Sequence, residues 1–126
     1  MCNSLNTSVI GLSLSKLTLN GTLSPALGNL TSLETLNLAT TMLSGPLPVE
    51  MSGLSRLARL DLSYNGLSGP LHDTIFSNLT SLSYLDFRSN RLSGTLPNSI
   101  FRPNSTISQL LLDNNNLAGE IPSSIG

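Results

Sequence analysis

The stretch "LDLSYNGLSGPL" from Leu60 to Leu71 decides the fold, because the chain repeats it with edits as "LDFRSNRLSGTL" from Leu85 to Leu96. The L-x-L pair that opens this stretch is one of five such pairs, at intervals of 24, 24, 25 and 25 residues, and in the fourth Phe87 takes the place of the second leucine. The opening leucines are Leu12, Leu36, Leu60, Leu85 and Leu110. A fixed period of roughly 20–50 residues is the signature of stacked repeats. The sequence therefore predicts a solenoid of about five coils.

Several columns of the repeat have a clear physical role. The L-x-L pairs alternate like a half-buried strand, and one such strand per repeat builds a parallel sheet. A further leucine column turns the chain back over the core, at Leu19, Leu43, Leu67, Leu92 and Leu117. Glycine follows two residues later in all five repeats, at Gly21, Gly45, Gly69, Gly94 and Gly119. Such a column indicates a site with no room for Cβ, or one that needs a positive φ.

Asparagine marks another column, but only in repeats three to five. A buried amide at this place can satisfy backbone groups in the turns of its own and the adjacent repeat. We therefore expect a structural ladder made of Asn65, Asn90 and Asn115. Leu17 and Thr41 hold the same place in the first two repeats, so the ladder should start only at the third.

The last third of each repeat has apolar residues three apart, as in Met51, Leu54 and Leu57. This spacing predicts a short helical or 3₁₀ turn on the outer side. Repeats three and four insert one residue here, and we expect Phe76 and Phe101 to fill the core at that point. The predicted fold class is an α/β solenoid that is mainly β with short 3₁₀ or helical turns.

Composition excludes several classes of function. The net charge is −1 and only 10% of residues are charged, whereas a nucleic-acid surface needs clustered lysine and arginine. No apolar run approaches the ~20 residues that span a bilayer. The first ten residues lack the basic start and apolar stretch of a secretory signal. Cys2 is the single cysteine, so the chain forms no internal disulfide.

The sequence also argues against an enzyme. His72 is the only histidine, and no nucleophile or orienting group is placed to work with it. No nucleotide-binding, zinc-protease or paired-cysteine metal motif occurs. The oxygen-rich run that starts at Asp113 includes Asn115, which is already assigned to the ladder, so calcium is not expected there. We predict no catalytic residue, no metal site and no cofactor.

Recognition residues are expected on the outward side of the strands. Repeats three to five mix charge with aromatic rings there, the composition of binding hot spots. The candidate ligand- or partner-binding residues are Arg59, Asp61, Tyr64, Tyr84, Asp86, Arg88, Gln109 and Leu111. The alternative is that the arginines only neutralise Asp61 and Asp86, which stack one strand apart. Leu111 indicates either a contact residue or a shift in strand register.

The chain also carries five N-glycosylation sequons. Their asparagines are Asn6, Asn20, Asn29, Asn78 and Asn104. The number exceeds chance only modestly and is weak evidence of secretion. Asn29 and Asn78 share one column of the outer turn, so sugars there would leave the strand face open.

The pattern L-x-L-x-x-N-x-L-S-G-x-[IL]-P, seen in "NRLSGTLP" and "NNLAGEIP", resembles the plant-type extracellular leucine-rich-repeat family. The resemblance covers residues 9–126 and implies a right-handed superhelix with its parallel sheet on the concave face. Residues 1–8 resemble a remnant of the family's N-terminal cap, with Cys2 where the second cap cysteine falls. Because the caps are missing or incomplete and solenoids need them, we expect a piece of a longer protein or a truncated product.

Members of this family are receptor-like kinases, receptor-like proteins and secreted inhibitors of cell-wall-degrading enzymes. The resemblance implies a non-enzymatic recognition module in the ectodomain of a plant cell-surface receptor, active in signalling or defence. It implies a protein, peptide or glycan partner on the concave strand face, such as a co-receptor or a cell-wall enzyme. No nucleic acid is expected, and a membrane only through a parent chain. The alternatives are a secreted inhibitor resembling those of polygalacturonases, and a structural solenoid without a specific ligand.

Overall fold

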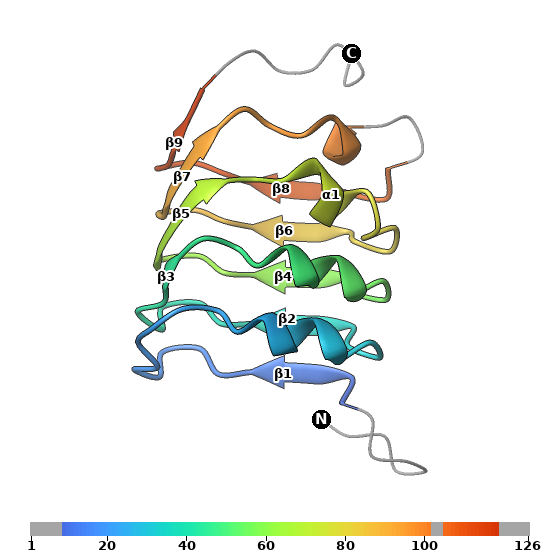
Figure 1. Cartoon of the computed structure of the whole chain (residues 1–126), viewed down its shortest axis with the longest axis horizontal. Coiled ribbons are helices and arrows are strands. Elements are labelled where there is room, and N and C mark those ends of the chain that lie inside the picture. The colour runs from blue at the N-terminus through green and yellow to red at the C-terminus, as the bar shows by residue number, and fades with distance from the viewer. Residues whose placement is uncertain (1–8, 102–104, 119–126) are drawn as a thin grey trace.

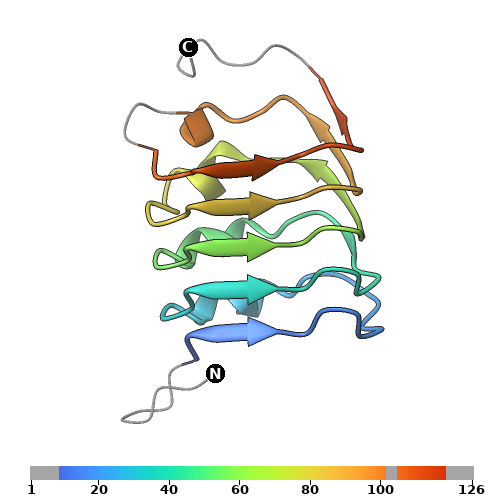
Figure 2. The same ribbon diagram turned by 180° about the vertical axis from the view of Figure 1, so that it is seen from behind.

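The protein is a stack of five coils, each contributing one strand to a continuous parallel sheet. The structure, a computed structural model, describes residues 9–101 and 105–118. The strands of this sheet are β1 (Gly11–Ser13), β2 (Thr35–Asn37), β4 (Arg59–Asp61), β6 (Tyr84–Asp86) and β8 (Gln109–Leu111). Figures 1 and 2 show this sheet on one side of the molecule and the helical turns on the other. The predicted leucine-rich solenoid is confirmed.

The register of the five strands follows the repeat. The five opening leucines pair in sequence across the sheet, from Leu12 and Leu36 at one end to Leu85 and Leu110 at the other. In the central strands these leucines are at most 1% exposed. A slip of one residue would turn them to solvent, so burial fixes the register.

A second parallel sheet forms the left edge of Figure 1, where the chain turns back over the core. Its strands are β3 (Ser44–Gly45), β5 (Gly66–Pro70), β7 (Arg91–Gly94) and β9 (Asn116–Leu117). The sequence pattern does not predict this sheet, because its strands are only two to five residues long and lack apolar alternation. Gly69 has a φ of +82°, and a Cβ there would stay 3.6 Å from its nearest neighbour. All four described glycines of the column have a positive φ, and at Gly45 a Cβ would in addition lie 2.9 Å from the Thr22 methyl group. Gly119 lies outside the described residues.

The outer turns are short helices, as predicted. They are η1 (Pro25–Asn29), η2 (Val49–Gly53), α1 (Asp73–Phe76) and η3 (Asn98–Phe101). In repeat three the extra residue accompanies a change from a 3₁₀ turn to α1. Phe76 is 3% exposed and meets the Phe87 ring edge to face at 6.2 Å, and Phe101 packs partly buried against the core. Both phenylalanines thus contribute to the core, as expected.

The asparagine ladder is present and links neighbouring coils. Asn65 Oδ1 accepts from the N–H groups of Thr41 (2.9 Å) and Leu43 (3.1 Å) in repeat two. Its Nδ2 donates to the carbonyls of Leu38 (2.9 Å) and Leu62 (3.1 Å). Asn90 and Asn115 repeat the arrangement one coil further on each time. The ladder begins at the third repeat, as predicted.

The first two repeats fill the ladder position differently. Thr41 is fully buried, and its hydroxyl donates to the Leu38 carbonyl of its own repeat at 2.7 Å. Leu17 is 51% exposed. At the N-terminal end of the stack there is an open hollow of about 410 Å³, lined mainly by leucines such as Leu12 and Leu23. The leucine core is therefore uncovered at this end of the described chain. The cap remnant expected in residues 1–8 lies outside the described residues.

Candidate binding surface

The parallel register places the candidate residues side by side on the solvent-facing side of the five-stranded sheet, opposite the helical turns. One row contains Arg59, Tyr84 and Gln109 on adjacent strands, and the next row contains Asp61, Asp86 and Leu111. Arg88 follows strand β6, and Tyr64 lies in the turn after strand β4. We call these eight residues the strand strip. The structure therefore brings together all of the residues that the sequence assigned to binding.

Arg59 stacks on Tyr84. The guanidinium carbon of Arg59 lies 3.8 Å from the centre of the Tyr84 ring, a cation–π contact between strands β4 and β6. Arg59 is exposed, and within residues 9–101 and 105–118 the one ion pair joins Arg88 to Asp86 instead. A guanidinium stacked by its face can still donate from its edge, which suits a carboxylate or carbonyl oxygen.

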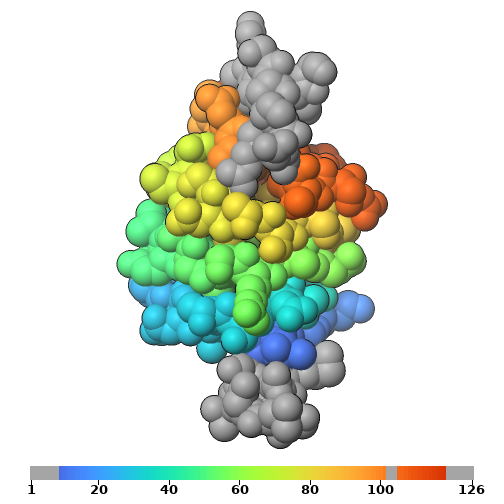
Figure 3. Space-filling model, turned by 90° about the vertical axis from the view of Figure 1, so that its right-hand side faces the viewer, coloured from blue at the N-terminus to red at the C-terminus, as the bar shows by residue number. Residues whose placement is uncertain are grey.

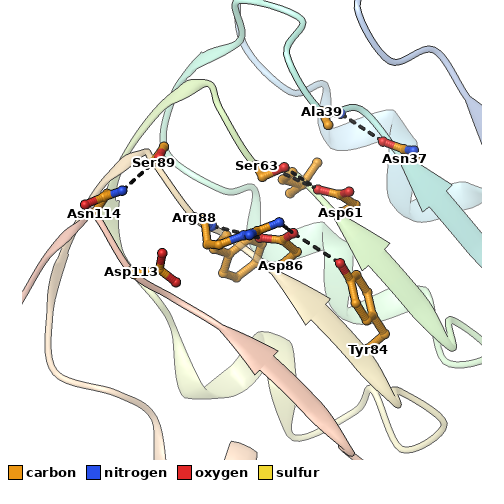
Figure 4. A network of polar contacts seen from close by, with 12 residues as sticks. Asn37, Ala39, Asp61, Ser63, Tyr84, Asp86, Arg88, Ser89, Asp113 and Asn114 are labelled. Atoms are coloured by element: carbon orange, nitrogen blue, oxygen red, sulfur yellow. Dashed lines mark hydrogen bonds and ion pairs between the residues drawn. The ribbon is translucent and has the colours of Figure 1, made fainter.

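Asp86 is the centre of a closed polar network (Figure 4). Arg88 Nε donates to Oδ1 at 3.0 Å, Arg88 Nη2 donates to Oδ2 at 2.8 Å, and the Tyr84 hydroxyl donates to Oδ2 at 3.2 Å. The Asp86 side chain is fully buried beneath these partners. The expectation for Asp86 therefore changes from a contact residue to a residue that holds Arg88 and Tyr84 in place.

The network shifts the pKa of each member. Burial alone would raise the pKa of Asp86, but the hydrogen bonds and charge of Arg88 outweigh it, so this pKa lies below its ordinary value. Burial, followed by the charge of Asp86, raises the pKa of the Tyr84 hydroxyl. The hydrogen bond to Asp86 raises the pKa of Arg88. At neutral pH the network thus contains a carboxylate, a guanidinium and a neutral phenol.

The alternative that the arginines neutralise the two aspartates agrees with the position of Arg88 but not with that of Arg59. Arg88 pairs with Asp86, so their charges cancel. Arg59 points sideways onto Tyr84, and Asp61 is half-buried with its Oδ1 accepting from the Ser63 N–H (3.0 Å) and hydroxyl (2.7 Å). The strip therefore presents one stacked cation and one partly exposed carboxylate.

Tyr64 presents an exposed ring from a left-handed turn. Its φ is 56° and its side chain is 53% exposed, with the Arg88 guanidinium carbon 5.9 Å from the ring centre. The matching residue of every other repeat also has a positive φ: Lys16, Thr40, Ser89 and Asn114. No residue type marks this column in the sequence, because only Asn114 is of a type that favours the conformation.

Leu111 and Gln109 complete the strip on strand β8. Asp86 pairs with Leu111 in the same register as the rest of the sheet, so no register shift occurs. Leu111 is half-buried and Gln109 is exposed. In the equivalent place, Asn37, Asp61 and Asp86 each accept a hydrogen bond from the N–H two residues later, and Leu111 lacks a side-chain acceptor for that role. Leu111 thus offers an apolar contact at the end of a polar row.

None of the three sequon asparagines that the structure describes belongs to the strand strip. Asn20, Asn29 and Asn78 are all exposed, and Asn6 and Asn104 lie outside the described residues. The part of the chain that the structure describes contains no cluster of histidine, cysteine, aspartate or glutamate able to hold a metal ion. None of the helices in that part is long and apolar enough to span a membrane.

A continuous parallel sheet backed by short helical turns, with leucines inward and variable side chains on the open face, is the architecture of a leucine-rich repeat solenoid. A family model described as Leucine Rich Repeat matches residues 56–79, 81–102 and 106–126, more than half of the sequence. The chain belongs to the leucine-rich repeat family. A search of curated protein sequences gives no match.

Solved structures extend the similarity to plant receptor ectodomains. The ectodomain of the Arabidopsis thaliana receptor kinase GASSHO1/SCHENGEN3, in complex with CASPARIAN STRIP INTEGRITY FACTOR 2, is 32% identical with a TM-score of 0.86. That match covers 93% of this chain and 14% of the other. For the BIR3–SERK2 complex from Arabidopsis thaliana the values are 33% identity, a TM-score of 0.90, and coverage of 98% and 66%. A plant ice-binding protein is 32% identical, with a TM-score of 0.81 and coverage of 98% and 40%.

Proposed function

We propose that the chain is a non-enzymatic recognition module from the ectodomain of a plant cell-surface receptor-like kinase or receptor-like protein. It binds a protein or peptide partner through the strand strip. The observation that carries this proposal is the stack of Arg59 on Tyr84, an exposed cation that the described part of the chain does not neutralise with an ion pair. The solved complexes of similar ectodomains support a protein or peptide as the partner. An extracellular location follows from the same similarity.

Within this proposal the residues of the strip have two roles. Arg59 donates a hydrogen bond to an oxygen of the partner. Tyr64, Leu111 and Gln109 contact the partner beside Arg59, and the half-buried carboxylate of Asp61 accepts a hydrogen bond from it. Asp86 acts through its neighbours, because it fixes the Arg88 guanidinium and the Tyr84 ring on which Arg59 lies. Tyr64 is an exposed aromatic residue beside Arg88, which Asp86 holds in place, and tyrosine and arginine are among the residue types that contribute most of the binding energy in protein interfaces.

Size makes this module one part of a larger contact surface. Five strands at ~4.8 Å give a strip of about 24 Å, whereas a ten-residue extended peptide spans ~33 Å. The chain covers only 14% of the GASSHO1/SCHENGEN3 ectodomain. A partner of that length therefore also contacts surface outside these five coils.

The ice-binding relative shows that the same fold serves another purpose. A surface of that type calls for a flat, regular row of threonine or serine. On the strip, aligned positions carry arginine, tyrosine and glutamine in one row and two aspartates and a leucine in the next. This mixture of charge and rings favours recognition of a protein.

The test uses peptides selected from a displayed library against the full chain. Arg59→Ala and Tyr84→Ala should each weaken the affinity of the selected peptides at least tenfold while circular dichroism stays unchanged. Arg56→Ala is the matched control, since Arg56 is an exposed arginine in the turn between η2 and strand β4 and is not a residue of the strip. Unchanged affinity in both strip variants, or an equal loss in the control, would overturn the proposal.

Location is tested separately on intact plant protoplasts. An antibody against the repeats should label the cell surface, and protease added outside should remove the label. Labelling only after the cells are permeabilised would contradict the extracellular assignment.

A further inference from the structure

Two sets of the described asparagines differ in what their side chains do. The ladder residues Asn65, Asn90 and Asn115 use both polar side-chain atoms for hydrogen bonds to backbone groups, and none of them starts a sequon. Asn20, Asn29 and Asn78 start sequons and are exposed, and their side chains form no hydrogen bond to another described residue. Of these three, Asn29 and Asn78 share one column of the outer turns. The fold therefore leaves these two amides free for a modification that needs the amide nitrogen in solvent.

Both asparagines lie on one edge of the molecule. Asn29 is the last residue of η1, and Asn78 follows α1 by two residues. Each stands six residues before the first residue of a strand, Thr35 or Tyr84. Figure 3 looks onto this edge, where the chain passes from the outer turns into the five-stranded sheet. The hydroxyl residues of the two sequons, Thr31 and Thr80, are exposed in the same turns.

In the second repeat, which lies between the repeats of Asn29 and Asn78, the equivalent position is a glycine with no space for a side chain. Gly53 stands six residues before strand β4, and a Cβ on it would lie 2.6 Å from the Gly28 carbonyl oxygen. Gly28 in turn faces the Glu50 backbone, so η1 and η2 pack main chain against main chain. Asn29 and Asn78 are therefore two coils apart, about 10 Å at the strand spacing, and the coil between them has no side chain at this position.

We propose that Asn29 and Asn78 carry N-linked oligosaccharides that cover this strand-entry edge. In the transfer, Nδ2 of the asparagine bonds to the anomeric carbon of a lipid-diphosphate-linked oligosaccharide. The anomeric C–O bond breaks, the lipid diphosphate leaves with the electron pair, and one amide proton is released. The proposal rests on the proposed function in one respect, that the native chain enters the secretory pathway.

The sugars limit where a partner can lie. They flank the sheet at the edge where the strands begin, whereas Tyr64 lies in a turn after a strand ends. The edge where the strands end therefore stays open, and a partner that contacts Arg59, the first residue of strand β4, extends along the strand toward Tyr64 and not outward across the strand-entry edge.

The experiment secretes the full chain from plant cells behind a cleavable signal, with an Asn-Gly-Thr tail as a positive control for the host. Glycosidase release in ¹⁸O-water marks each occupied asparagine as labelled aspartate for peptide mass spectrometry. We expect label at Asn29, at Asn78 and in the tail. Asn29→Gln and Asn78→Gln should each remove one glycan, and Thr31→Ala and Thr80→Ala should do the same by an independent route if a glutamine variant is not secreted.

The outcomes separate this proposal from the proposed function. An occupied tail with Asn29 and Asn78 unmodified would overturn the modification. A change of more than tenfold in the affinity of a strip-selected peptide on removal of both glycans would overturn the placement of the partner. Occupied sites in a chain whose strip variants bind the peptides normally would overturn the proposed function and leave the modification intact.

Discussion

The Leu67 N–H donates to Oδ1 of Asn90 at 3.0 Å, across the boundary between the third and fourth repeats. The same side chain donates from Nδ2 to the Leu62 carbonyl at 2.9 Å and to the Phe87 carbonyl of its own repeat at 3.1 Å. One amide thus completes the turn of one coil from the next. Neighbouring coils are joined by these amides as well as by the strand hydrogen bonds.

Asn90→Ala should lower the free energy of unfolding by about 1–3 kcal/mol, because buried backbone groups lose their partners. Urea denaturation monitored by circular dichroism measures the change. Asn116→Ala is the control, since Asn116 is exposed, and it should stay within about 0.5 kcal/mol of the parent. A loss of only a few tenths at Asn90 would refute the structural role of the ladder there.

Asp86→Asn should lower stability at neutral pH and reduce its acid dependence. The folded-state pKa of Asp86 lies below the unfolded value near 3.9, so its contribution is fully present above that value. The contribution is lost as pH falls through the folded-state pKa. Melting temperatures from pH 7 down to about pH 2 should therefore fall less steeply in the variant. Asp113→Asn, at an exposed carboxylate, is the comparison; identical slopes in parent and Asp86→Asn would contradict the network.

Gly53→Ala should destabilise the fold by about 1–3 kcal/mol, the usual effect of overpacking. Its new methyl group would lie 2.6 Å from the Gly28 carbonyl oxygen, which is main chain and cannot rotate away. Thermal unfolding measures the effect against Ser52→Ala, the half-buried neighbour in the same turn. Equal stability of the two variants would mean that η1 and η2 can separate freely.

Tyr64→Ala should weaken strip-selected peptides at least tenfold with little change in the free energy of unfolding. Its ring is 53% exposed, so the fold gains little from it. Val49→Ala is matched in exposure at 50% but lies in η2, away from the strip. Peptide affinities that fall equally in both variants, or in neither, would remove Tyr64 from the binding surface.

The sequence predicted the repeat, the register and the ladder because each depends on residue types that recur at a fixed interval. Asn65 and the leucine columns are examples in which identity and role coincide. It could not predict that Arg59 stacks on Tyr84 while Arg88 pairs with Asp86. That choice depends on side-chain direction across two strands, and both arginines look alike in the sequence. The second sheet has no such signal either, since its strands are two to five residues long and share no apolar alternation.

The left-handed column after the strands has a practical consequence. Lys16, Thr40, Tyr64, Ser89 and Asn114 share one backbone shape and have no common chemistry. In the first four of these residues the N–H donates to a carbonyl of the next coil, so backbone contacts hold the shape whichever of these side chains is present. A combinatorial library that varies these five codons would diversify the rim of the scaffold while leaving its interior untouched, which makes this rim a natural starting point for engineered binders.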